Sequence, residues 1–286
     1  APPAPPEPPA PPSPPEPPAP PVSDACGAQI LKADGTPWQC TFHDDFDGAE
    51  LDRSQWAPQT LAYTTGDATA GYACYVDDPK NISVGGGMLS LTVRREDSPQ
   101  PCLSATSLDA VSSPYTAGMV STYHLFSQQY GRFEARIRNT ASSAPGLQET
   151  FWLWPDDRYV TLDWPTTGEI DVSETYSVFA DLSIPFLHYG TTRPEPSVPG
   201  VNTAYDCIAH RGVWNIYTLE WTPTTLTILV NGQHCLTNES GDSAFQRPYL
   251  LALTQALGQR GQTDNSLTDA TPLPATMDVD YVRVWK

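Results

Sequence analysis

The sequence has few basic residues and no long apolar segment. It contains 15 Lys and Arg against 33 Asp and Glu, so its formal net charge is −18 at pH 7. Nucleic acids and anionic membrane surfaces carry dense negative charge and repel such a protein. No apolar run approaches the roughly 20 residues needed to cross a bilayer. We therefore expect no nucleic-acid partner and no membrane span. A neutral substrate fits the composition better.

The sequence also lacks a long amphipathic helix and a repeat of fixed period. It offers short runs in which apolar and polar residues alternate, such as residues 88–95 and 131–138, as half-buried strands do. Asn231-Gly232 lies between two further runs and is a strong signal for a β-hairpin. Residues 248–257 and 277–286 are predicted as additional strands. These patterns predict an all-β domain built as a two-sheet antiparallel sandwich.

Proline is concentrated at one end of the chain. Residues 1–21 are nearly all Pro and Ala and predict an extended polyproline II linker or stalk, on the order of 65 Å long at ~3.1 Å per residue. This segment fits a spacer at a cell envelope and an inert linker equally well. Residues 22–286 are predicted to form one large domain. The chain opens on Ala1, from which we expect that a leader was removed or that the chain was cut there.

The cysteines lack the spacing of a metal site. No two form a CxxC pair, which argues against zinc. Their even number favours disulfides, an oxidising compartment and a secreted protein. Of the 15 possible connectivities we favour pairing in sequence order, because each loop then spans about one hairpin or strand pair. The cysteines are Cys26, Cys40, Cys74, Cys102, Cys207 and Cys235.

Three acids lie within six residues of a predicted strand, in the stretch GEIDVSE. Glu169 and Asp171 share a face of a regular strand, whereas Glu174 points to the other face. One extra residue, a β-bulge near 172–173, would bring all three to one face. The two Glu carboxyl groups could then approach the ~5–5.5 Å typical of a retaining glycosidase. A solvated acidic strand face is the alternative.

The same stretch resembles the ExDxxE motif of glycoside hydrolase family 16, in the bulged form of its laminarinase-like (endo-β-1,3-glucanase) branch. The resemblance extends over nearly everything after the proline segment, in the order of the family's blocks. The resembling blocks are residues 43–56, 130–138, 151–155, 164–171, 188–190, 217–233 and 277–286. It implies a β-jelly-roll sandwich with a concave substrate cleft.

The resemblance also implies roles for the acids. Glu169 corresponds to the nucleophile, Glu174 to the general acid/base and Asp171 to the residue that orients the nucleophile. The implied reaction is retaining hydrolysis of a β-linked polysaccharide, endo-acting on β-1,3-glucan, through a covalent glycosyl-enzyme. No cofactor is required for that chemistry.

Aromatic and polar residues near the acids are candidates for sugar contacts, since aromatic planes bury the apolar faces of sugar rings. The resemblance places Trp152 and Trp164 beside the reacting ring. Trp154 fits either the site or the core, and the later Trp221 and Trp285 are predicted in the core. Further candidates by resemblance are His188, Asn81 and Gln255.

The resemblance further implies a structural calcium ion away from the cleft. Asp280 matches its carboxylate ligand, and the regions 44–47 and 85–87 are placed to supply oxygens. Surface acids without an ion are the alternative.

One block departs from the family pattern and leaves the substrate open. Where the family often has GLWPAFW this chain has GLQETFW, with Gln148 for a tryptophan and Glu149 for a proline. A β-galactan hydrolase is therefore an alternative, although so acidic a chain disfavours sulfated substrates. A non-catalytic glycan-binding module and a cell-wall transglycosylase are also compatible with the resemblance. We expect a monomer whose partner is a neutral polysaccharide.

Overall fold

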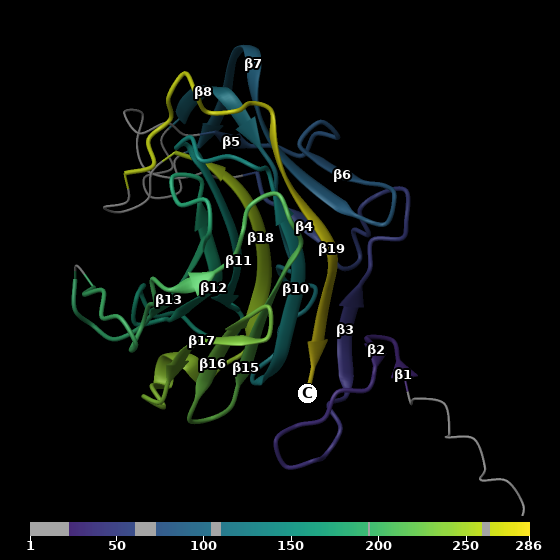
Figure 1. The fold of residues 1–286 in the computed structure, drawn as a ribbon, viewed down its shortest axis with the longest axis vertical. Helices are drawn as coiled ribbons and strands as arrows, with labels where there is room; N and C mark the ends of the chain where they lie inside the picture. Colours follow the sequence, from purple (N-terminus) through teal and green to yellow (C-terminus); the bar gives the residue numbers. More distant parts are fainter. Residues whose placement is uncertain (1–22, 61–72, 104–109, 194, 259–263) are drawn as a thin grey trace, which may run out of the picture.

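Two curved, packed sheets make up the protein in the computed structural model (Figure 1). The structure describes residues 23–60, 73–103, 110–193, 195–258 and 264–286, so the proline segment 1–21 lies outside the described residues. The described ladders are antiparallel except for β5–β8. The prediction of an all-β antiparallel sandwich is confirmed. Within the described chain, no helix is long and apolar enough to span a bilayer.

The larger sheet has ten strands in the order β17-β16-β15-β10-β19-β7-β8-β5, with β3 also paired to β19 and β6 to β7. Its strands are β3 (Cys40–Asp44), β5 (Cys74–Tyr75), β6 (Ile82–Val84), β7 (Leu89–Leu103), β8 (Ala110–Ala117), β10 (Gly131–Asn139), β15 (Asn215–Trp221), β16 (Leu226–Val230), β17 (Gln233–Asn238) and β19 (Ala275–Trp285).

The smaller sheet has seven strands in the order β14-β13-β12-β11-β18-β9-β4. Its strands are β4 (Ala57–Pro58), β9 (Met119–Ser121), β11 (Leu147–Pro155), β12 (Glu169–Tyr176), β13 (Leu182–His188), β14 (Cys207–Ile208) and β18 (Tyr249–Leu257). A short ribbon of β1 (Ser23–Asp24) and β2 (Gly27–Ala28), and the 3₁₀ turn η1 (Ser243–Phe245), complete the described elements.

The predicted strands and hairpin are confirmed, and local chemistry explains them. Asn231 and Gly232 join β16 to β17 with φ of 52° and 75°, the left-handed values of a tight hairpin turn. Alternate residues of the strands pack between the sheets, where Trp221 is fully buried as expected. Burial of such large aromatic surfaces is the main stabilising contribution to this core. Trp285 is also buried, but on the other face of the larger sheet, opposite Arg132.

Three disulfides join the cysteines in sequence order, as predicted. They are Cys26–Cys40, Cys74–Cys102 and Cys207–Cys235. The third links β14 of the smaller sheet to β17 of the larger one and so ties the two layers together. Disulfides of this kind persist in oxidising compartments, which is consistent with an extracellular location.

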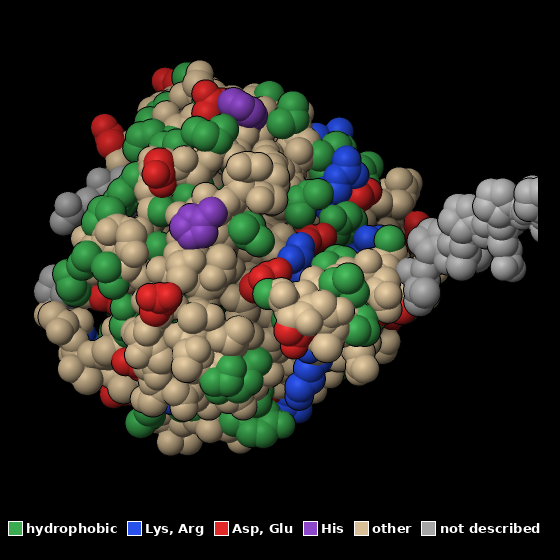
Figure 2. Space-filling model, turned by 60° about the horizontal axis from the view of Figure 1, so that its bottom comes forward, with side chains coloured by type: hydrophobic (Ala, Val, Ile, Leu, Met, Phe, Trp, Pro, Cys, Tyr) green, Lys and Arg blue, Asp and Glu red, His purple; other side chains and the backbone are tan. Residues whose placement is uncertain are grey.

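Basic side chains on the larger sheet lie next to acids. Figure 2 shows Lys and Arg gathered on the right half of the visible face, interleaved with Asp and Glu. Across the strands of this sheet, Arg132 pairs with Glu220 and Arg138 with Asp278 at 2.6 and 2.8 Å. These positive charges are therefore largely neutralised locally.

Candidate active site

The predicted β-bulge is present in β12. Asp171 pairs with Phe186 of β13 and Glu174 with Ile184, so three steps on β12 match two steps on its neighbour. The pairing with β11 shifts at the same place. The extra residue falls at 172–173, as predicted, and restores the parity of the strand. Ile170 and Val172 enter the core, whereas the three acids share the outer face of the smaller sheet.

Glu169 is the first residue of β12 and follows Gly168, a position that requires glycine. Gly168 has φ of +92°, and a Cβ there would collide with the hydroxyl of Tyr249. The Glu169 side chain is 3% exposed, and its Oε2 accepts a 2.7 Å hydrogen bond from the indole Nε1 of Trp164. Trp164 itself is 37% exposed. The candidate nucleophile therefore lies deep, beneath an accessible aromatic ring.

His188 places a positive charge beside the first two acids. Its Nε2 lies 3.3 Å from Asp171 Oδ2, and its Nδ1 lies 2.7 Å from Glu195 Oε2. Burial by itself would lower the pKa of His188, but the hydrogen bonds to Asp171 and Glu195 and the charge of Glu169 outweigh it and raise the pKa to about 10. The imidazolium therefore favours ionised carboxylates at this end of the site.

Glu174 has a different set of partners. Its Oε1 accepts hydrogen bonds from Gln148 Nε2 at 2.8 Å and from the hydroxyl of Tyr176 at 2.9 Å. Both of these donors are neutral, unlike the His188 cation beside Asp171 and Glu169. Two carboxylates on one face with unlike surroundings are the arrangement that separates a nucleophile from an acid/base.

Trp152 and Trp154 extend this face away from the acids. Four directly opposed residues form a row across neighbouring strands of the smaller sheet. The row runs from Asp171 of β12 through Trp152 of β11 and Ala252 of β18 to Ser121 of β9. Directly opposed residues share a face, so this row leads from the acids into a neighbouring pocket of about 240 Å³. The lining residues are Gln59, Met119, Ser121, Tyr123, Trp152, Trp154, Leu250 and Ala252. Both tryptophans therefore belong to the surface of the site.

Two of the predicted sugar-binding residues are placed differently from expectation. Gln255 is opposite Glu149, on the core side of the sheet, and its Nε2 donates to Glu149 Oε1 at 3.2 Å. It does not face the cleft; Thr254, one residue earlier, does, and accepts from Trp152 Nε1 at 2.9 Å. The error arises because a strand reverses facing at every residue.

Asn81 is 1% exposed, and its side chain makes hydrogen bonds to strands of the larger sheet. Its Nδ2 donates to Thr92 O at 2.9 Å and to Thr116 Oγ1 at 3.1 Å. Both amide hydrogens are used within the protein, so this placement does not support the predicted sugar contact.

The two residues that depart from the family block lie on opposite faces of the smaller sheet. Gln148 reaches Glu174 on the outer face. Glu149 points into the core, where Arg211 binds both its oxygens at 2.7 Å. The additional acid is therefore neutralised behind the site and does not add to the charge within it.

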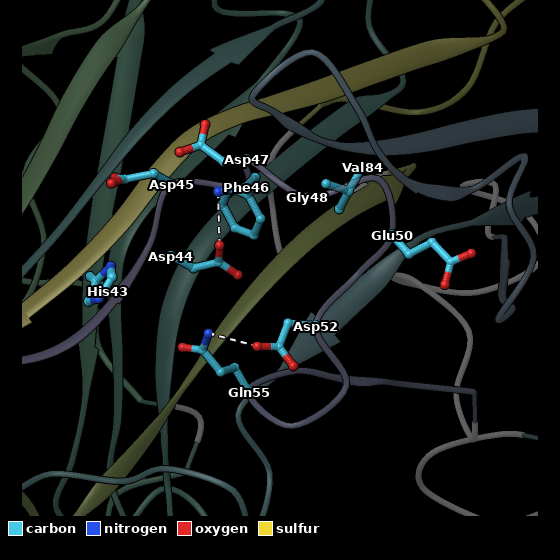
Figure 3. Close-up of a pocket in the computed structure, with 10 residues that line it drawn as sticks. All are labelled: His43, Asp44, Asp45, Phe46, Asp47, Gly48, Glu50, Asp52, Gln55 and Val84. Atoms are coloured by element: carbon cyan, nitrogen blue, oxygen red, sulfur yellow. Dashed lines mark hydrogen bonds between the residues drawn. The ribbon is translucent and has the colours of Figure 1, made fainter. Parts of the chain in front are cut away.

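Asp280, the predicted calcium ligand, lies on β19 and accepts from Arg136 at 2.7 Å. Residues 44–47, which were predicted to supply further calcium ligands, border a separate pocket of about 300 Å³ (Figure 3). There Asp44 accepts from the amide of Phe46, and Asp52 accepts from Gln55. The pKa of Asp44 is raised, and burial of the carboxyl group is the largest cause. These protein donors compete with a cation for the carboxylates, and calcium binding stays a prediction.

Sequence reasoning did not identify Glu195 or Tyr176. Tyr176 lies two residues after Glu174 and so on the same face, a signal that could have been used. Glu195 lies in a loop after β13 whose sequence shows no periodic pattern. Its role can be seen only from its contact with His188 in the structure.

A sandwich whose smaller sheet carries an acid triad flanked by tryptophans has the fold and the site of a carbohydrate-cleaving hydrolase. The sequence profile described as "Glycosyl hydrolases family 16" matches residues 68–270. The chain belongs to this family.

Individual relatives agree with this assignment. The chain is 26% identical to the glucan endo-1,3-beta-glucosidase A1 of Niallia circulans over 86% of its own length and 37% of the relative's. It is 30% identical to the keratan-sulfate endo-1,4-beta-galactosidase of Sphingobacterium multivorum over 60% of this chain and 40% of the relative. The chain thus spans well under two thirds of these relatives.

Solved structures show the same fold. The laminarinase from Rhodothermus marinus superposes with a TM-score of 0.68 at 24% identity, covering 87% of this chain and 97% of that one.

Proposed function

We propose that the protein is a secreted, retaining endo-glycosidase that hydrolyses a neutral β-linked polysaccharide, with β-1,3-glucan as its substrate. The observation that carries the proposal is the β12 bulge, which sets Glu169, Asp171 and Glu174 on one face with different partners. A solvated acidic strand face does not fit, because the three acids are only 3, 2 and 6% exposed.

In the proposed mechanism Glu169 attacks the anomeric carbon and forms a glycosyl-enzyme while Glu174 gives its proton to the departing glycosidic oxygen. Glu174 then removes a proton from water, which attacks the anomeric carbon and releases Glu169. The Trp164 donor and the nearby His188 cation support ionised Glu169 as the nucleophile. Asp171, held by His188, would orient Glu169.

Support for β-1,3-glucan comes from the glucanase relative and from the aromatic lining next to the acids. Trp152 and Trp154 meet edge to face at 5.9 Å and border the adjoining pocket. Their planes suit the apolar faces of successive sugar rings. The three disulfides support secretion.

A β-galactan is the second candidate substrate. It is favoured by Gln148, which replaces a tryptophan of the family block, and by the endo-1,4-beta-galactosidase among the relatives.

The decisive experiment compares the wild type with Glu169→Gln on laminarin and on neutral galactans, measured as reducing ends released. We expect wild-type release of oligosaccharides, initial products that retain the β-configuration by NMR, and a loss of at least about 10³-fold in the variant. Circular dichroism should show an unchanged fold. Full turnover by Glu169→Gln would exclude it as nucleophile, and no release from any polysaccharide would favour a glycan-binding module. Products longer than the substrate would indicate a transglycosylase.

A further inference from the structure

Two buried donors hold one oxygen of Glu174. Gln148 Nε2 lies 2.8 Å and the Tyr176 hydroxyl 2.9 Å from the same atom, Oε1. Gln148 is fully buried and Tyr176 is 4% exposed. The two residues are directly opposite each other on β11 and β12. Their positions relative to Glu174 are therefore set by the strand register and not by flexible loops.

We propose that Gln148 and Tyr176 are positioning residues that determine which oxygen of Glu174 carries the proton for the leaving group. The inference rests on the proposed function, in which Glu174 is the acid. Oε1 is a poor place for a proton, because the amide nitrogen of Gln148 carries only donor hydrogens and the Tyr176 hydroxyl would have to turn from donor to acceptor. The donors therefore direct the proton to Oε2 and fix the rotamer that presents it.

The orientation of the Gln148 amide supports this role. Its Oε1 is buried and has no hydrogen-bond partner in the described part of the chain. Turning the amide over would place this acceptor against the Glu174 carboxylate and lose a donor. The orientation that leaves Oε1 without a partner is thus the one that gives Glu174 its amide donor.

The test uses Gln148→Met and Tyr176→Phe, which keep the side-chain volume and remove the donor. Each variant is assayed on two substrates with the same glycone, an oligosaccharide and its 2,4-dinitrophenyl glycoside. The oligosaccharide leaving group needs a proton, whereas dinitrophenolate departs without one. The parameter kcat/KM reports only the steps through formation of the glycosyl-enzyme, so it isolates the acid role of Glu174.

We expect each variant to lower kcat/KM on the oligosaccharide about tenfold, a part of the ~10²–10⁴ contributed by general acid catalysis, and to change it less than about twofold on the dinitrophenyl glycoside. Gln255→Met is the matched control. It removes an equally buried amide from the neighbouring strand, on the core side of the sheet. Its two kcat/KM values should fall together or not at all.

Equal losses on both substrates in Gln148→Met and Tyr176→Phe would overturn the proposal, because they would indicate general structural damage. Unchanged rates on both substrates would overturn it as well. If Gln148→Met does not fold, Tyr176→Phe still decides, since it removes a single hydroxyl. A wild type inactive on both substrates would instead refute the proposed function, so the two failures are distinguishable.

Discussion

The buried ion pair behind the catalytic strand allows a quantitative test. Arg211 and Glu149 are 2% and 1% exposed at their side chains and form two bonds of 2.7 Å. Burial alone would lower the pKa of Arg211, but the charge and hydrogen bonds of Glu149 raise it. Each charge thus depends on the other for compensation.

Replacement of Arg211 by Met leaves the buried carboxyl of Glu149 without its cation. Breaking such a pair costs about 3–5 kcal/mol. Thr175 still donates to Glu149 Oε2 at 2.7 Å and Gln255 to Oε1 at 3.2 Å, so we expect the lower end, about 3 kcal/mol. For a domain of this size that lowers Tm by about 6–12 °C.

The double variant Glu149→Gln/Arg211→Met removes both charges and keeps an acceptor for Thr175. We expect it to be more stable than Arg211→Met alone by about 2 kcal/mol. Urea unfolding followed by tryptophan fluorescence, with the disulfides intact, measures both differences. A loss below about 1 kcal/mol in Arg211→Met, or a double variant no more stable than the single one, would refute the account of the pair.

Three further outcomes follow from the structure. Because the pKa of His188 is raised from 6.5 to about 10, its stabilisation is complete below pH 6.5 and declines as pH rises to about 10, by on the order of 5 kcal/mol; His188→Gln should lack this part of the slope in urea titrations, and an identical slope would exclude the assignment. Trp164→Phe keeps a ring and removes the donor to Glu169, so kcat should fall about tenfold; an unchanged kcat would show that the bond is not used. Cys207→Ala/Cys235→Ala cuts the link between the sheets and should cost about 2–5 kcal/mol of stability in thermal unfolding; a variant as stable as the wild type would contradict that role.

The strands and the bulge could be predicted because they depend on short stretches of chain. Alternation in β7 and β10 and the Asn231-Gly232 turn act within a few residues. The bulge followed from the spacing of the acids alone. Gln255 shows the limit: a one-residue error in strand facing moved it from the cleft to the core, where Thr254 was the polar residue on the outer face.

The sequence by itself determined an all-β chain and the three acids of one strand, because alternation, turn chemistry and spacing are local properties; it favoured the order of the disulfides without fixing it. Only the tertiary structure decided which residues surround those acids. Arg211 meets Glu149 across 62 positions, and Glu195 reaches His188 from a loop without any pattern. Such contacts depend on how the strands are ordered and packed, and the linear sequence does not show which distant residues that packing brings together.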